Sequence, residues 1–121
     1  MATSDGPLEG DALLDAIASA MAELHRRYYY REPATAKAAM MGEDLLACVL
    51  GGVYTDVEKT LIEIQRGMNV TNNRNAFQSA MEDRFVLAVE SLSGRRVAEF
   101  ISAHHVGPDL EIELFFLADP D

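Results

Sequence analysis

Residues 101 to 116 read "ISAHHVGPDLEIELFF" and contain two of the three histidines of the chain together with three carboxylates. Two adjacent histidines precede a Gly-Pro-Asp, and two glutamates then alternate with apolar residues. Imidazole and carboxylate groups can bind a metal ion or exchange protons, so this stretch could be a metal site or a catalytic site. The alternative is a β-hairpin that carries histidines near its tip.

The geometry of a strand favours the hairpin. Adjacent strand residues point to opposite faces, so His104 and His105 cannot bind one metal ion from a regular strand. A two-residue or four-residue loop through Gly107-Pro108 sets His104 opposite Glu111 or Glu113. Such an opposite-charge pair stabilises a sheet by roughly 0.2–1 kcal/mol. We therefore expect a His–Glu pair on the surface. We place His105 near the rim of the core, on the face of Ile101, Ala103, Ile112 and Leu114.

A metal site would need more ligands than this hairpin supplies. Zinc is usually held by three or four convergent Cys, His or carboxylate ligands. The third histidine, His25, lies in the first helix, which we place far from the hairpin. Ser102, His105 and Asp109 could form a Ser-His-Asp set, but no nucleophile elbow surrounds the serine. We expect neither a metal nor a cofactor.

A small-ligand or hydrolytic site is the alternative function that these residues allow. Its candidates lie in the hairpin and at the end of the preceding helix: Glu90, Arg95, Ser102, His105, Asp109 and Glu113. In the registers above, His105 and Glu113 fall on opposite faces, which counts against one site. We expect Arg95 to bind the carbonyls at the end of the long helix, and Glu90 to pair with an arginine.

Composition excludes several classes of partner. The formal net charge is −10, so nucleic acids and anionic membrane surfaces are repelled. One cysteine, Cys48 in "LLACVL", excludes an intrachain disulfide and is expected in the core. The first ten residues lack the basic start and apolar run of a signal peptide, and no apolar stretch approaches about 20 residues, so we expect neither a signal peptide nor a membrane span. We predict a cytoplasmic protein that does not insert into the membrane and reaches it only through a membrane-protein partner.

Periodicity and turn signals predict one α+β domain over residues 11–118, after a flexible tail at 1–10. The order is α-β-β-α-α-β-β, in a two-layer sandwich with a four-stranded, largely antiparallel sheet and helices on one face. Helices are predicted at 11–30, 55–66 and 72–93, with Gly67 ending the second. A hairpin is predicted at 34–50. "TDVE" at residues 55 to 58 is a capping box that begins the second helix.

Three features suggest association. The first helix carries apolar residues spaced alternately by three and four, as in a coiled-coil seam: Leu14, Ile17, Met21, Leu24 and Tyr28. This stripe fits a helix lying on its own sheet, and it also fits a helix that pairs with a copy of itself. The run Leu45–Leu50 is apolar on both faces, so its strand is central or is covered by another chain. A further apolar sheet face is expected through Phe100, Phe115 and Leu117. We therefore predict a homodimer as the leading assembly.

Three segments resemble one bacterial family. They are "YTDVEKTL", "FQSAMEDRFVLAVESLSGRRV" and "FISAHHVGPDLEIELFFL". They look like the MpsC-like family, whose pattern has Leu-Thr-x-x-Glu at a helix start. The pattern continues with Val-Glu-x-Leu-Thr-Gly-Arg-x-Val at a helix end and Ser-Asp-x-His-x-x-Pro-Asp before a Glu-x-Phe strand. Ala103 replaces the acid after the serine, and "YREP" at 30 to 33 replaces Gly-Arg-Gly-Pro.

The resemblance implies a role without implying a reaction. The family is named for a Na+-translocating, membrane-potential-generating system that is linked to ion or bicarbonate uptake. In that system it is the small soluble component beside membrane subunits. The resemblance therefore implies an accessory or interaction domain more than an enzyme. If the acid at position 103 or the glycine loop binds something in the family, we expect that activity to be altered or absent here.

Overall fold

The computed structural model of the chain describes residues 7–29, 31–63, 67–105 and 109–119. Its elements are helix α1 (Gly10–Tyr29), strands β1 (Thr35–Met41) and β2 (Leu45–Gly51), helices α2 (Asp56–Glu63) and α3 (Gly67–Ser93), and strands β3 (Val97–His105) and β4 (Leu110–Leu117). The strands form one antiparallel sheet in the order β1-β2-β4-β3. The predicted α+β class and element order are confirmed.

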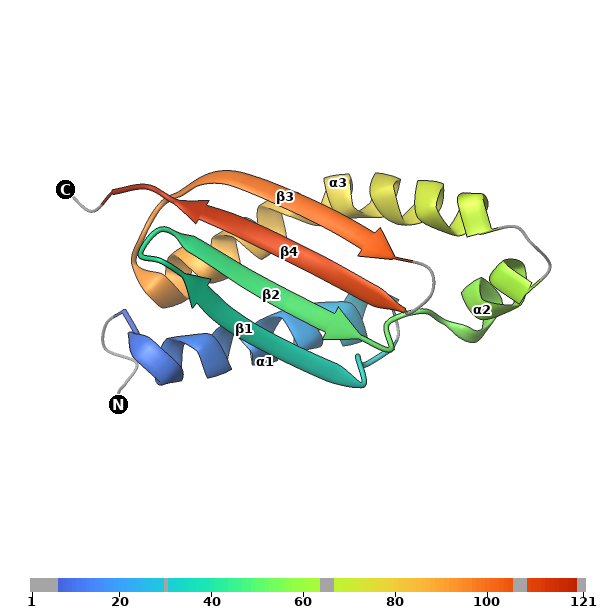
Figure 1. The fold of residues 1–121 in the computed structure, drawn as a ribbon, viewed down its shortest axis with the longest axis horizontal. Coiled ribbons are helices and arrows are strands. Elements are labelled where there is room, and N and C mark those ends of the chain that lie inside the picture. Colours follow the sequence, from blue (N-terminus) through green and yellow to red (C-terminus); the bar gives the residue numbers. More distant parts are fainter. Residues whose placement is uncertain (1–6, 30, 64–66, 106–108, 120–121) are drawn as a thin grey trace.

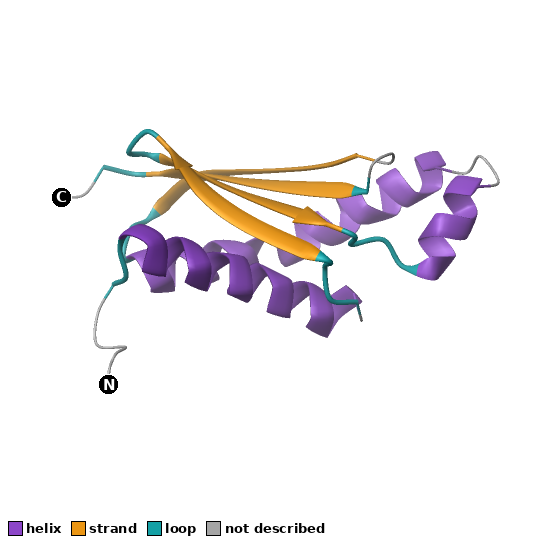
Figure 2. Ribbon diagram, turned by 60° about the horizontal axis from the view of Figure 1, so that its bottom comes forward, coloured by secondary structure: helices purple, strands orange, loops and turns teal. Residues whose placement is uncertain are grey.

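The sheet forms one layer of the structure, and the described helices cover only one of its two faces (Figures 1 and 2). Helices α1 and α3 lie side by side under one face of the sheet, with α1 under β1 and α3 under β3 (Figures 1 and 2). Helix α2 lies beyond the end of the strands and contacts α3 (Figure 1). No described element covers the opposite face of the sheet, which we call the outer face (Figure 2). The core therefore sits entirely between the inner face and the two long helices.

Apolar side chains from every layer close this core. Ile17 and Met21 of α1 are fully buried, as are Leu46 and Leu50 of β2. Three rings continue the core across the sheet: the centroids of Phe85 and Phe100 lie 6.1 Å apart, and those of Phe100 and Phe115 lie 5.1 Å apart. Phe100, Phe115 and Leu117 thus pack against the helices. The expectation that they form a second apolar sheet face was wrong.

Local signals begin and end several elements as predicted. The backbone N–H of Thr55 donates to Glu58 Oε1 at 2.8 Å, and that of Glu58 donates to Thr55 Oγ1 at 3.2 Å, which completes the capping box. Gly94 follows α3 with a φ of 72°, a left-handed conformation that glycine adopts without strain. Gly67 was wrongly placed, because it begins α3 instead of ending α2.

The folded domain begins before residue 11. The backbone N–H of Leu8 donates to the carbonyl of Leu92 at 2.9 Å, and the Leu8 side chain packs against the core. A Cβ added at Gly94 would meet the ring of Pro7 at 2.4 Å, so the chain passes closely over the end of α3. The tail predicted at residues 1–10 is therefore too long by at least these two residues.

Helix α1 lies on its own sheet. Its most buried line runs at intervals of four through Leu13, Ile17, Met21 and His25. Ile17 and Met21 have no exposed surface, so neither can meet a second chain. The other residues of the proposed seam, Leu14, Leu24 and Tyr28, are half-buried and pack against the core. The heptad-like spacing is thus satisfied largely within one chain.

Candidate functional site

Strand β4 turns its glutamates into the core. Glu111 and Glu113 are fully buried, while Ile112, Leu114 and Phe116 face outward. The register pairs His104 with Glu111, which is one of the two registers predicted. The predicted sidedness was wrong, because this pair lies on the inner face and not on the surface. Burial of an unpaired carboxylate costs several kcal/mol, so each glutamate requires partners.

His25 is the partner of Glu111. The Nδ1 of His25 donates to the carbonyl of Met21 at 2.9 Å, and its Nε2 contacts Glu111 Oε2. A carbonyl can only accept, so Nδ1 carries a proton. A hydrogen bond between Nε2 and Oε2 then requires one further proton, carried by either the imidazole or the carboxyl. The expectation that His25 lies far from the hairpin was wrong, because its side chain reaches Glu111 of β4 from helix α1.

Two more side chains extend this buried cluster. His104 Nδ1 lies 3.6 Å from Glu111 Oε1, and the hydroxyl of Ser102 donates to Glu113 Oε1 at 2.6 Å. Both contacts follow from the register, which sets Ser102 opposite Glu113 and His104 opposite Glu111. We call His25, Ser102, His104, Glu111 and Glu113 the core polar cluster. The imidazole of His25 also stacks on Phe85, with ring centroids 5.8 Å apart.

Burial controls the protonation of this region. It raises the pKa of Glu113 to about 9, and the carboxylate of Glu111 acts in the same direction, whereas the Ser102 hydroxyl opposes it. The Glu113 carboxyl is therefore neutral at pH 7. Burial likewise raises the pKa of the Cys48 thiol to about 12, with the carboxyls of Glu113 and Glu111 adding to the effect. Cys48 is a core residue, as predicted, and is no nucleophile.

Asp109 stabilises the loop before α2 through hydrogen bonds to its backbone. Its two carboxylate oxygens accept hydrogen bonds from the backbone N–H groups of Val53 and Tyr54, at 2.9 and 3.0 Å. The Tyr54 hydroxyl donates in turn to the carbonyl of His105 at 2.8 Å. These bonds fasten the loop before α2 to the turn end of the β3–β4 hairpin. The turn residues predicted at the tip, Gly107 and Pro108, lie outside the described residues.

Arg95 and Glu90 lie at the other end of the sheet. The guanidinium of Arg95 donates to the carbonyls of Glu43 and Ala118 and to the carboxylate of Asp44, at 2.7 to 2.9 Å. Arg95 thus joins the β1–β2 turn to the segment after β4. The expectation that it binds the carbonyls at the end of α3 was wrong. Glu90 accepts a hydrogen bond from the backbone N–H of Val97 at 2.9 Å.

The predicted site residues do not converge. Ser102 and Glu113 are in contact inside the core, whereas His105 is exposed on the outer face. Asp109 is bound to the loop before α2, and Arg95 and Glu90 are near the opposite ends of the strands. Among the residues that the structure describes, no three His, Cys, Asp or Glu side chains are grouped to hold a metal ion.

Sequence reasoning missed the burial of His25, His104 and Glu111. One signal was present in the helix, since His25 continues the four-residue spacing of Ile17 and Met21. A second was present in β4, where Phe115 and Leu117 share the face of the glutamates, and Phe116 shares the face of Ile112 and Leu114. Alternation alone therefore could not tell which face of this strand is solvated.

The outer face is the main apolar surface left uncovered. The registers arrange most of it in three rows that cross the sheet from β1 to β3, beside a fourth row of Thr35, Gly51, Leu110 and His105 at the end of the sheet nearest the β3–β4 turn. The first row is Lys37, Val49, Ile112 and Ala103; the second is Ala39, Ala47, Leu114 and Ile101; the third is Met41, Leu45, Phe116 and Glu99. Met41 is 62% exposed, Ile101 50%, Val49 38% and Phe116 36%.

The helical side of the molecule offers a smaller surface. Leu24, Tyr28 and Leu87 line a groove of about 440 Å³ between α1 and α3. Two arginines flank it: the guanidinium of Arg84 lies 4.9 Å from the centre of the Tyr28 ring, and that of Arg27 lies 6.0 Å away. Two residues of the predicted α1 seam, Leu24 and Tyr28, line this groove.

Comparison with known proteins identifies the family. The profile of the family described as "Na+-translocating membrane potential-generating system (MpsC)" matches residues 11–119, and the chain belongs to this family. The match covers nearly the whole chain, from α1 to the end of β4. No curated protein and no solved structure matched the chain in the same comparisons.

Proposed function

We propose that this member of the MpsC family is an accessory domain that acts by protein association, as a homodimer joined through the outer face of its sheet. The observation that carries the proposal is the uncovered apolar surface centred on Val49, Ile112 and Leu114. Exposed apolar area of this extent is costly in water, and a second sheet packed on it would remove that cost.

The other residues support association over catalysis. Apart from His105, which is exposed on the outer face, the candidate polar side chains either belong to the core polar cluster or bind the backbone of loops and strand ends, as Asp109 and Arg95 do. In the described part of the chain, none of the helices combines the length and apolar character needed to cross a bilayer. The family name supports a place within a membrane-potential-generating system, where this domain would serve an integral membrane partner.

The charge distribution on the outer face favours a second copy of the chain as the partner that covers it. The chain carries a net charge of −10, yet the three rows of the outer face contain one cation, Lys37, and one anion, Glu99. The face is therefore formally neutral within these rows, and two copies can meet there without like-charge repulsion. A strongly basic or acidic partner would find no complementary charge on this surface.

Light scattering on the purified chain tests the proposal. We expect a dimer mass at micromolar concentration. Val49→Lys places a charge at the centre of the face and should raise the dimer Kd by about a hundredfold, because the charge would be desolvated in the dimer. Val57→Lys, on exposed α2, is the matched control and should leave the mass unchanged.

Two results would overturn this proposal. One is a monomer mass for the wild-type chain across the whole concentration range. The other is a dimer that survives Val49→Lys and dissociates on Leu87→Lys, because Leu87 lies in the groove between α1 and α3. The second result would move the interface to the helical side. Circular dichroism of each variant confirms that the fold is retained.

A further inference from the structure

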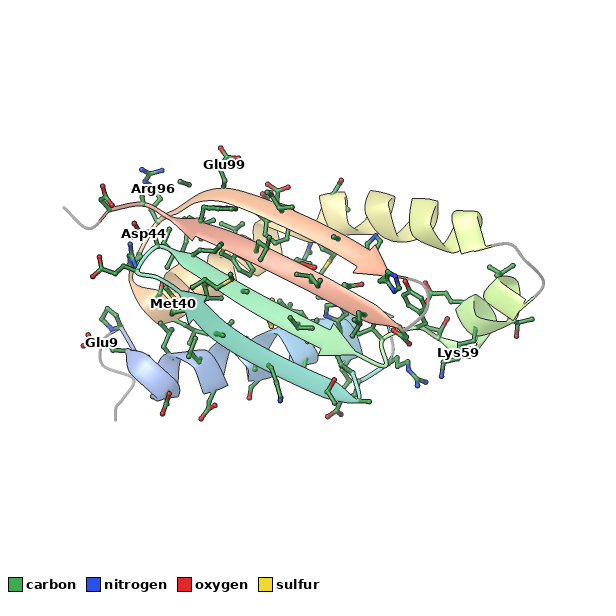
Figure 3. All side chains as sticks on the ribbon, in the orientation of Figure 1. Glu9, Met40, Asp44, Lys59, Arg96 and Glu99 are labelled. Carbon is green, nitrogen blue, oxygen red and sulfur yellow. The ribbon has the colours of Figure 1, made fainter. Side chains whose placement is uncertain are left out.

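The outer face has a diagonal arrangement of charge. Lys37 occupies one corner of the three rows and Glu99 occupies the corner diagonally opposite, while the positions between them are apolar. Lys37 lies on β1 and Glu99 on β3, so each charge is on a free edge of the sheet. Figure 3 shows Glu99 at the β3 edge. Both side chains are exposed.

The surface between these corners is nearly square. Three strand spacings of about 4.8 Å and two steps of about 6.8 Å along a strand each amount to roughly 14 Å. Because the surface is nearly square, a two-fold axis that lies in the interface along the uncharged diagonal exchanges the two charged corners. That axis runs from the corner of Met41 to the corner of Ala103.

We propose that two copies of the chain pack outer face to outer face about this diagonal axis, with Lys37 of each copy paired with Glu99 of the other. The inference rests on the proposed function and names the arrangement and the residues that specify it. The axis lies about 45° from the strands, so the two sheets cross at about 90°, which is one of the two established classes of sheet packing. Two-fold symmetry makes the interface self-complementary, and each dimer contains the ion pair twice.

The alternative class of packing leaves these charges unmatched. In this class the strands of the two copies are aligned within about 30°, and the two-fold axis runs along or across the strands. Such an axis does not exchange the charged corners. Lys37 of one copy then lies above apolar or edge positions of the other copy. Burying an ammonium or a carboxylate without a partner is costly. The two charged corners therefore select the crossed arrangement over the aligned one.

Zero-length cross-linking tests the arrangement on the unmodified protein. A carbodiimide joins a lysine amine to a carboxylate only when the two are in contact. Within one chain Lys37 and Glu99 are roughly 20 Å apart along the diagonal, so a bond between them can form only between copies. We expect the Lys37–Glu99 isopeptide in the dimer band. The other lysine of the chain, Lys59 on α2, is the internal control and should yield no Glu99 product.

Charge reversal provides the second test. Lys37→Glu or Glu99→Lys alone sets like charges together twice in each dimer, so the Kd should rise roughly tenfold. Combining both substitutions restores opposite charges and should return the Kd to within about threefold of the wild-type value. Lys37→Arg keeps the charge and should preserve the dimer while removing the cross-link.

The outcomes separate this inference from the proposed function. A dimer that loses affinity on Val49→Lys, yet gives no Lys37–Glu99 product and does not respond to charge reversal, overturns the crossed arrangement and leaves the homodimer standing. A wild-type monomer overturns both. Rescue by the double reversal, together with the cross-link, establishes the crossed arrangement.

Discussion

The imidazole of His25 and the carboxyl of Glu111 form a hydrogen bond inside the core, although 86 residues separate them in the chain. Both side chains are fully buried. The pair joins helix α1 to strand β4, which are the first and last elements of the fold. Burying such a pair costs desolvation energy. If one partner is lost, the remaining polar group is left in the core with no water molecule to take the place of the lost partner.

The first prediction concerns this pair. His25→Leu should lower the free energy of unfolding by about 3–5 kcal/mol, because Glu111 is left in the core without its partner. Replacing both residues by leucine should cost less than the sum of the single changes, since neither polar group is then stranded. Urea denaturation of the wild type, the two single variants and the double variant measures this coupling. His105→Leu on the exposed face is the control, with a change within about 0.5 kcal/mol.

The second prediction concerns Glu113 and pH. Its pKa rises from an ordinary 4.5 to about 9 on folding, so the folded chain binds one more proton than the unfolded chain between these values. Stability therefore falls as pH rises through this window, by up to about 1.4 kcal/mol per pH unit from this group. Below pH 4.5 the group contributes no pH dependence.

Glu113→Gln tests this linkage. Glutamine is neutral and its carbonyl can still accept from Ser102, so the variant should be more stable than the wild type at pH 8, and the two should converge near pH 4.5. The change at pH 8 should be on the order of a few kcal/mol. Denaturation midpoints measured from pH 4.5 to 9 provide the comparison. A constant difference between the two chains would contradict a raised pKa.

The third prediction concerns the loop before α2. Asp109→Ala removes the acceptor for the backbone N–H groups of Val53 and Tyr54, and should cost about 1–3 kcal/mol because both lie in the buried part of the loop. Hydrogen exchange of these two amides should accelerate more than that of amides in the centre of the sheet. Asp119→Ala, at an exposed position, is the matched control. Unchanged protection would show that the carboxylate is dispensable.

The fourth prediction concerns Cys48. The thiol is buried and its pKa is raised to about 12, so the thiolate is scarce at pH 8 and reagents cannot reach it. Alkylation by iodoacetamide should be at least about a hundredfold slower in the folded chain than in 8 M urea. Leu87→Cys adds an exposed thiol on α3 and should react within minutes under native conditions. Rapid labelling of wild-type Cys48 would indicate that the core opens readily.

Local patterns in the sequence were sufficient for the order and class of the elements. The capping box at Thr55 and Glu58, the break at Gly94 and the alternation in "LEIE" depend on neighbours within a few residues, and the structure contains each of them. The pairing of His104 with Glu111 was also among the registers that turn geometry allowed. The predicted family membership rested on motifs of the same local kind and is confirmed.

The sidedness of the sheet was decided only by tertiary structure. A strand such as β4 has polar and apolar residues on both faces, so its own sequence does not say which face meets the helices. The answer depends on the packing of Phe115 and Leu117 under α1 and α3, and on His25, which makes burial of Glu111 tolerable from a distant helix. The sequence by itself determined the elements, their order and the alternation of side chains. Tertiary packing decided which side of that alternation became the core and which became the exposed face, because burial is a property of elements that meet and not of one strand.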